Sequence, residues 1–162
     1  MRIIKAPKPL KNIEGKTIFL AGSIEMGTAE NWQQKTEKLL RDFNCTILNP
    51  RRDDWDSTWE QSIHNKQFRE QVEWELDALE NADLIAMYFD SNTKSPITLL
   101  ELGLFIGSTD MIVCCPDGYW RKGNVDIVCD RYDNYSYDNY SMVQVNDFYD
   151  FVDKIILFLK RC

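Results

Sequence analysis

Short apolar runs alternate with amphipathic helical patterns along most of the chain. Apolar runs of strand length that end at glycine, proline or aspartate predict buried strands, and apolar side chains spaced three and four positions apart predict helices that cover them. The predicted strands are residues 16–22, 45–50, 82–90, 111–115 and 124–130, and residues 134–145 form an irregular segment with an edge strand at its end. The predicted helices are residues 29–43, with Thr28 as N-cap, 61–81, 96–107 and 147–160.

This alternation predicts an α/β fold in which helices cover both faces of a mostly parallel, five-stranded sheet. In such sheets, ligands bind beyond the carboxyl ends of the strands, near the point where the strand order reverses. The 162 residues fit one domain, 1–162, with residues 1–15 as an N-terminal extension. Three segments far apart in the sequence are expected to meet at the carboxyl ends: "AGSIEMG" (21–27), "NPRRDDW" (49–55) and "DSNTKSPITLLELG" (90–103).

One carboxylate interrupts the most apolar helical stretch, "SPITLLELGLFIG". On a helix, Glu101 has Ile97, Leu104 and Phe105 as neighbours on the same face. An ionised carboxylate that is buried without a partner costs several kcal/mol or shifts its pKa, so its place on an apolar face favours a functional role. A glutamate that faces water is the alternative.

A second carboxylate lies in an apolar stripe of the helix predicted before it. Phe68, Val72, Leu76 and Leu79 form the stripe, and Glu75 lies three positions after Val72 and four before Leu79. An ion pair at the edge of the stripe is the alternative. Two carboxylates that face one pocket can divide their roles, one acting as an ionised nucleophile and the other as a proton donor with a raised pKa. Glycosyl transfer with retention uses such a pair and needs no metal or organic cofactor.

Composition and charge argue against several classes of protein. The chain is 44% hydrophobic and 28% charged, and no stretch reaches the roughly 18 consecutive apolar residues of a membrane span. The basic N-terminus lacks the apolar region and cleavage site of a secretory signal, so a cytoplasmic protein is expected. A net charge of −7 argues against nucleic acid as a partner. Five cysteines without a CxxC pair, and a single histidine, His64, argue against a zinc site or a Cys–His catalytic pair.

The turn "AGSIEMG" after the first predicted strand is a candidate ligand contact. Gly22 and Gly27 flank this turn, where backbone N–H groups can meet a ligand, and an ordinary tight turn is the alternative. The turn has neither the G-x-G-x-x-G of a dinucleotide site nor the GK[ST] of a P-loop.

The loop after the second predicted strand carries two kinds of candidate. The arginines of "RRDDW", residues 51–55, suit a phosphate, but two aspartates follow at once, which favours a loop whose charges compensate one another. Trp55 and Trp59 suit stacking on a nucleobase, with packing over the core as the alternative.

Four stretches, in this order and covering roughly residues 17–107, resemble the nucleoside 2-deoxyribosyltransferase family in its branch with the NPRR loop: "IFLAGSIEMGTAENWQ", "LNPRRDDWD", "FREQVEWELDALENADLIAMYF" and "SPITLLELG". The resemblance implies a flavodoxin-like, three-layer fold and exchange of the base of a 2′-deoxyribonucleoside through a deoxyribosyl–enzyme ester. It implies a 2′-deoxynucleoside and a free nucleobase as partners, no cofactor, and a homo-oligomer in which a neighbour's C-terminal region completes the pocket. Residues 132–146 match that region, with a solvated surface loop as the alternative.

The family pattern also implies roles for single residues. The nucleophile is the Glu of the ELG motif, which falls on Glu101, and an acidic partner eight positions before the Asp that opens the third strand falls on Glu75. Asp90 matches an acidic group that protonates or orients the base, at a longer spacing to Glu101 than in the best-known members. Phe19 stands where many members carry a tyrosine beside the nucleophile. The implied substrate-binding positions are Phe19, Gly22, Ser23, Asn49, Arg51, Asp53, Trp59 and Gln71.

One departure bears on the choice of substrate. Related enzymes that hydrolyse 2′-deoxynucleoside 5′-monophosphates have GSIRGG where this chain has "GSIEMG", so Glu25 replaces an arginine and repels a phosphate. A free nucleoside is therefore favoured, with Arg51 and Arg52 as the opposing argument. The alternatives are an N-glycoside hydrolase of 2′-deoxynucleosides or their 5′-monophosphates, and a non-catalytic nucleotide-binding module.

Overall fold

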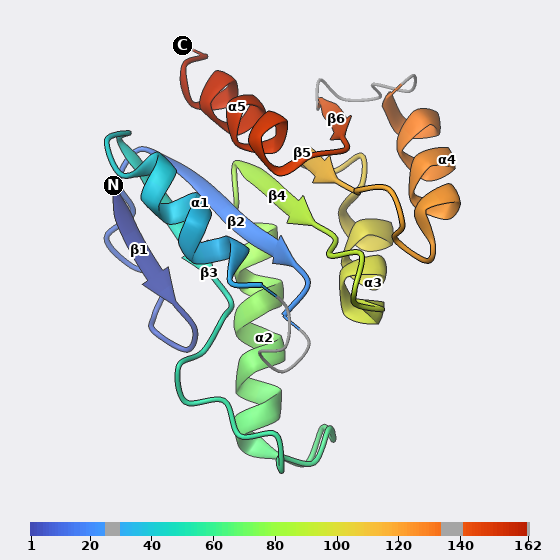
Figure 1. The fold of residues 1–162 in the computed structure, drawn as a ribbon. Helices are drawn as coiled ribbons and strands as arrows, with labels where there is room; N and C mark the ends of the chain where they lie inside the picture. The colour runs from blue at the N-terminus through green and yellow to red at the C-terminus, as the bar shows by residue number, and fades with distance from the viewer. Residues whose placement is uncertain (25–29, 134–140, 162) are drawn as a thin grey trace.

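Six parallel strands form one sheet in the order β1-β3-β2-β4-β5-β6, as the computed structural model shows for residues 1–24, 30–133 and 141–161 (Figure 1). The five strands after β1 follow the flavodoxin-like order, with the first strand between the second and the third. The predicted α/β, flavodoxin-like fold is confirmed, with six strands in place of five. The strands are β1 (Arg2–Lys5), β2 (Lys16–Gly22), β3 (Cys45–Asn49), β4 (Leu84–Tyr88), β5 (Asp110–Cys114) and β6 (Met142–Val145).

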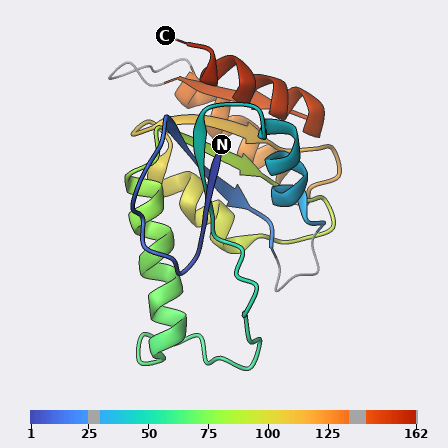
Figure 2. The same cartoon turned by 90° about the vertical axis from the view of Figure 1, so that its left-hand side faces the viewer.

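Five helices cover the two faces of the sheet: α1 (Trp32–Leu40), α2 (Lys66–Glu80), α3 (Pro96–Phe105), α4 (Lys122–Asp133) and α5 (Phe148–Leu159). Helices α1 and α5 lie on one face, and α2, α3 and α4 lie on the other (Figures 1 and 2). Strand β2 serves both cores, since Ile18 and Leu20 pack toward α1 and α5 while Phe19 and Ala21 pack toward α2 and α3. Burial on both faces explains why the central strands are continuous apolar runs.

Two predicted elements are wrong. Residues 124–130 belong to helix α4, because Val125 and Cys129, four positions apart, face the core while Ile127 is 71% exposed. The alternating apolar residues there imitate the period of a strand. Residues 1–15, expected to be an extension, contribute strand β1, which pairs with β3 at the edge of the sheet.

The helix boundaries differ from the predictions at their N-termini. Helix α1 begins at Trp32, where the Asn31 side chain accepts a hydrogen bond from the backbone N–H of Gln34, and the predicted cap Thr28 lies outside the described residues. Helix α2 begins at Lys66 rather than near 61, with Asn65 as its cap. Its N-terminal half, with the loop before it, extends beyond the carboxyl ends of the strands (Figure 2).

After the neighbouring parallel strands β2 and β4, the chain leaves toward opposite faces of the sheet. After β2 it continues into α1 on one face, and after β4 it continues into α3 on the other, so the two connections diverge at the carboxyl ends. This is the switch point at which open α/β sheets bind ligands. The first and third of the three predicted segments therefore begin at neighbouring strand ends, and residues 25–27 of the first lie outside the described residues.

Gly22 allows the ends of β2 and β4 to approach closely. Its φ is +144°, and a Cβ atom there would lie 2.2 Å from the carbonyl oxygen of Tyr88 and 3.0 Å from the ring of Trp32. The next residue, Ser23, donates its N–H to the same Tyr88 oxygen at 3.0 Å. A side chain at position 22 would force the two strand ends apart.

We predict that Gly22→Ala destabilises the protein by about 2–4 kcal/mol, because the new Cβ overlaps the Tyr88 carbonyl and the backbone conformation is unfavourable for alanine. Denaturant unfolding followed by circular dichroism measures the change. Gly123→Ala is the matched control, since nothing lies within 4 Å of a Cβ at that helical position, and we expect it to be neutral or stabilising by up to about 1 kcal/mol. Equal stabilities for the two variants would contradict the prediction.

Candidate active site

Three buried hydroxyl groups join the carboxyl ends of β2 and β4 to the start of α3. Ser23 Oγ accepts the backbone N–H of Asp90 at 2.9 Å and lies 2.9 Å from Thr93 Oγ1. Thr93 Oγ1 lies 2.7 Å from Ser95 Oγ, and Ser95 Oγ also forms a short hydrogen bond with Ser23 Oγ. These contacts fix the segment between β4 and α3 against the end of β2.

Residues that follow β5 also hold the segment between β4 and α3. The carbonyl oxygen of Lys94 accepts hydrogen bonds from Tyr119 Oη at 2.8 Å and from Trp120 Nε1 at 3.0 Å. Ser95 follows with a φ of +46°, in the left-handed region, and Pro96 opens α3. A non-glycine residue persists in that conformation only where its surroundings hold it, so the start of α3 is rigidly placed.

Glu101 is 8% exposed and lies on the same side of α3 as Thr98 and Leu102. Burial raises its pKa to about 8, and the nearby carboxylate of Glu75 adds to this rise. Within the part of the chain that the structure describes, no side chain or backbone group donates a hydrogen bond to it. The predicted burial of this carboxylate is confirmed.

The apolar face predicted to surround Glu101 is wrong in part. Ile97 and Leu104 are 59% and 56% exposed, and Phe105 packs against the core. Helix α3 is apolar on nearly every side, so its periodicity does not reveal which side meets the sheet.

Glu75 comes from α2, is partly buried and accepts a hydrogen bond from Gln71 Nε2 at 2.7 Å. Burial raises the pKa of Glu75 to about 7, and the bond from Gln71 opposes that rise. The predicted stripe is wrong in part, because Val72 and Leu76 are exposed. The side of α2 that meets the core is formed by Gln71, Trp74, Ala78 and Leu79.

We call Glu75 and Glu101 the carboxylate pair. The two side chains come from neighbouring helices on the same face of the sheet, and each carboxyl group disfavours ionisation of the other (Figure 1). Their pKa values lie near neutrality, where an ordinary glutamate is fully ionised. A pair of this kind can attack as a carboxylate and transfer a proton at the same pH.

Asp90 contacts the buried hydroxyl group of Ser23 through its backbone N–H and is not part of the carboxylate pair. It is buried at the carboxyl end of β4, and its Oδ1 accepts the backbone N–H and the side-chain amide of Asn92 at 2.9 and 3.1 Å. Its Oδ2 has no hydrogen-bond partner among the residues that the structure describes.

The start of the loop after β3 is held by hydrogen bonds to α1 and by one bond within the loop. Asn49 donates to Glu37 Oε1 at 2.7 Å and accepts the backbone N–H of Arg51 at 2.9 Å. Arg51 donates to Gln33 Oε1 at 3.3 Å and has no carboxylate partner among the described residues. The side-chain nitrogen and oxygen of Asn49 are therefore both engaged in hydrogen bonds within the protein. Gln33 Nε2, in contrast, is buried and has no hydrogen-bond partner in the described parts of the chain.

The charges farther along the same loop compensate one another, as predicted. Arg52 binds Asp54 at 2.9 Å and Glu70 at 3.4 Å, and its guanidinium lies 5.1 Å from the ring centre of Trp59. The Trp59 ring also packs edge-on against Trp55 at 5.1 Å. Asp53 is exposed and binds Lys5 of β1 at 2.8 Å.

The remaining predicted positions lie beneath the site or at its edge. Phe19 has no exposed surface and packs against Trp74 with 6.5 Å between ring centres, so it supports the site from the core. Gly22 and Ser23 lie at the switch point. Sequence reasoning missed Thr93, Ser95, Tyr119 and Gln33, because their partners come from other elements and no local pattern marks them.

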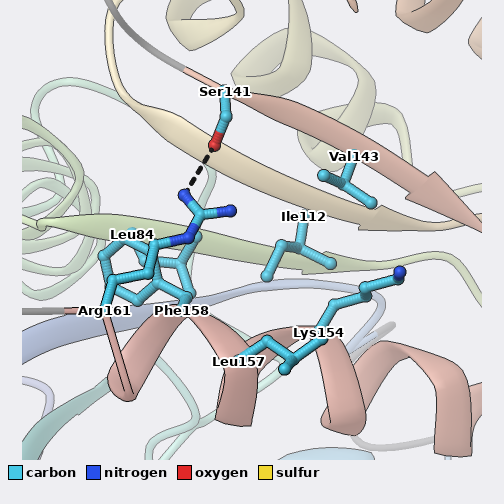
Figure 3. A pocket seen from close by; sticks show the side chains of 8 residues that line it. All are labelled: Leu84, Ile112, Ser141, Val143, Lys154, Leu157, Phe158 and Arg161. Carbon is cyan, nitrogen blue, oxygen red and sulfur yellow. Dashed lines mark hydrogen bonds between the residues drawn. The ribbon is translucent and has the colours of Figure 1, made fainter.

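A pocket of about 120 Å³ lies elsewhere, between α5 and the sheet (Figure 3). Arg161 reaches across its rim to Ser141 Oγ at 3.2 Å, and Ile112, Val143 and Phe158 line it. It lies on the face opposite to the carboxylate pair and brings no pair of catalytic groups together.

Across the described residues, no cluster of three or more His, Cys, Asp or Glu side chains has the arrangement of a metal site. No described helix is both long and apolar enough to cross a membrane. The described cysteines Cys45, Cys114, Cys115 and Cys129 are buried and free.

Comparisons with known proteins identify a family and a shared fold. The model of a family described as "Nucleoside 2-deoxyribosyltransferase like" matches residues 15–119, more than half of the chain. A solved structure of a conserved protein from Enterococcus faecalis V583 matches 89% of this chain and 99% of its own, with a TM-score of 0.57 and 12% identity, which shows a shared fold. No curated protein matches the chain.

We predict that Glu101→Gln stabilises the protein increasingly as the pH rises. The folded-state pKa of Glu101, about 8, lies above the ordinary value of 4.5, so the native protein loses stability as the pH rises from about 4.5 through 8, whereas a glutamine has no charge to bury. The gain grows by up to about 1.4 kcal/mol per pH unit in that window. Denaturant unfolding at pH 5, 7 and 9 measures it. The exposed Glu80→Gln is the control, and equal pH dependence in both variants would refute the prediction.

Proposed function

Since the chain belongs to the nucleoside 2-deoxyribosyltransferase-like family, we propose that it exchanges the base of a 2′-deoxyribonucleoside through a deoxyribosyl ester on Glu101. One observation carries this proposal. The buried carboxyl group of Glu101, without a hydrogen-bond donor among the described residues, lies near the partly buried carboxyl group of Glu75, at the end of the sheet where such folds bind ligands. A carboxylate with few donors and little water is a strong nucleophile in its ionised form.

The chemistry needs only the carboxylate pair and two substrates. The Glu101 carboxylate forms a bond to C1′ while the C1′–N bond breaks and its electron pair leaves with the base. Glu75 in its protonated form gives its proton to that base. The acceptor base then attacks C1′, releases Glu101 and returns its own proton to Glu75. Two displacements at C1′ retain its configuration.

The other implied residues take supporting roles in this proposal. The free Oδ2 of Asp90 lies at the carboxyl end of β4 and orients the base, as the family resemblance implies. Ser23 fixes the turn beneath the sugar, and Phe19 supports the pair from the core. Trp59 keeps the loop folded through Arg52, and Asp53 reaches a ligand after leaving Lys5.

A hydrolase that acts on 2′-deoxynucleoside 5′-monophosphates is the second candidate. It is favoured by Arg51, which donates a hydrogen bond to the neutral amide of Gln33 and has no acidic partner among the described residues, so its guanidinium can still bind a phosphate. In that reaction water takes the place of the acceptor base.

Assembly into a homo-oligomer completes the proposal. The two helices that carry the carboxylate pair, α2 and α3, also expose large apolar side chains: Val72, Leu76, Ile97, Leu100 and Leu104. Exposed apolar side chains are often covered in an interface, and the family resemblance implies a second copy of this chain as the partner.

We predict that Glu101→Gln lowers the rate of base exchange by at least about 10³-fold and Glu75→Gln by about 10²-fold. The assay incubates 2′-deoxyinosine or thymidine with and without adenine and separates nucleosides and bases by chromatography. Deoxyadenosine formed only with adenine supports transfer. Base released equally without adenine, or only from monophosphates, supports the hydrolase. The matched control, Glu80→Gln, removes an exposed carboxylate of α2 and is expected to keep full activity; full activity in Glu101→Gln would refute the proposal.

We predict that Leu100→Lys shifts the protein from an oligomer toward a monomer, because a charge at the centre of an apolar interface loses its water without gaining a partner. Size-exclusion chromatography with light scattering measures the mass. Ile127→Lys, at an exposed apolar position of α4, is the control and leaves the mass unchanged. A monomeric unmodified protein at micromolar concentration would refute the assembly.

A further inference from the structure

Gln71 connects the carboxylate pair to the loop after β3. Its side chain is 4% exposed and forms two hydrogen bonds through the same nitrogen, Nε2. One bond goes to the carbonyl oxygen of Pro50 at 2.8 Å, and the other goes to Glu75 Oε1 at 2.7 Å. An amide nitrogen carries two hydrogens, so it serves both acceptors at once. Gln71 Oε1 is buried and has no partner among the described residues.

The Pro50 carbonyl determines which end of the amide meets Glu75. A carbonyl oxygen only accepts hydrogen bonds, so the amide end beside it must be the nitrogen. The reversed amide would set two oxygen atoms against each other. Glu75 therefore always meets a donor, and a hydrogen bond donated to a carboxylate favours its ionised form.

Glu101 has no comparable donor among the described residues. The two arginines of the loop after β3 do not remove this difference between Glu75 and Glu101, because both have other partners. Arg51 binds Gln33, and Arg52 binds Asp54 and Glu70. Two adjacent buried carboxyl groups resist carrying two negative charges, so near neutral pH they share one proton.

We propose that Gln71 is a positioning residue that keeps Glu75 ionised in the ligand-free protein and so places the shared proton on Glu101. The catalytic meaning of this placement rests on the proposed function. The nucleophile is then held as a neutral acid until a substrate binds.

The proton must move before the chemistry begins. The proton passes from Glu101 to Glu75, which leaves Glu101 ionised. Glu101 then bonds to C1′, the C1′–N electron pair leaves with the base, and Glu75 gives the same proton to that base. The step ends with an ester on Glu101, an ionised Glu75 held again by Gln71 and a neutral base, so no further reactant is required.

The test follows the titration of Glu75 in the full chain without any substrate. Carbon-13 labelled glutamate reports each side-chain carboxyl group by NMR, and Glu75→Gln and Glu101→Gln assign the two signals. The Glu101→Gln background removes the coupling between the two groups. Within it, adding Gln71→Met is expected to raise the Glu75 midpoint by about one pH unit or more, the usual effect of losing one hydrogen bond to a charged group.

Two further variants keep the test decisive. Gln67→Met, an exposed position of the same helix, is the matched control and leaves the midpoint unchanged. Gln71→Asn, whose shorter side chain does not reach both acceptors, raises the midpoint as Gln71→Met does and serves if that variant folds poorly. In the unmodified protein, Glu75 is expected to lose its proton at a lower pH than Glu101.

An unshifted Glu75 midpoint, or a Glu101 that ionises before Glu75, would overturn the role of Gln71. The measurement needs no turnover, so it stays informative if base exchange is not found. A protein that exchanges bases but shows no shift would refute this inference and leave the proposed function intact.

Discussion

The carboxylate pair sets the central physical constraint on this molecule. Two acidic groups lie where water is scarce and where the charge of one opposes ionisation of the other. Such an arrangement weakens the native state progressively as the pH rises from about 4.5 to about 8, and it persists because the surrounding core offsets that loss. Helices α2 and α3 carry the two groups and rest on the same core through Trp74, Leu79 and Leu102. The fold therefore holds together two side chains that would separate if they were placed on loops.

The rigid placement of α3 is the second constraint on the candidate active site. Three hydroxyl groups anchor the start of this helix to the end of β2, while Tyr119 and Trp120 hold the Lys94 carbonyl from the opposite side. The left-handed backbone at Ser95 is maintained by these contacts. As a result, the position of Glu101 depends on residues that follow β2, β4 and β5.

Sequence reasoning located the central strands along the chain and singled out Glu75 and Glu101, both of which the structure places where burial raises their pKa values, and it failed where local periodicity is ambiguous. Strands buried on both faces leave unmistakable apolar runs, so β2 to β5 were predictable. Residues 124–130 alternate like a strand yet form a helix, because only the tertiary fold decides whether Ile127 faces the core or the solvent. For α3 and the middle of α2, apolar residues occur on both sides, and Ile97 and Val72 proved to be exposed. The bonds of Gln33 and Tyr119 depend on distant elements and leave no local pattern.

Strand β1, at one edge of the sheet, helps to shape the loop after β3. Its register against β3 brings Lys5 beside Asn49, the Ala6 N–H donates to the Asn49 carbonyl at 3.1 Å, and Lys5 binds Asp53. The loop after β3 is thus partly shaped by residues that precede the region shared with the family. A relative without an equivalent strand would hold this loop differently. Changes at the beginning of the chain can therefore alter the shape of this loop while the acidic groups themselves stay the same.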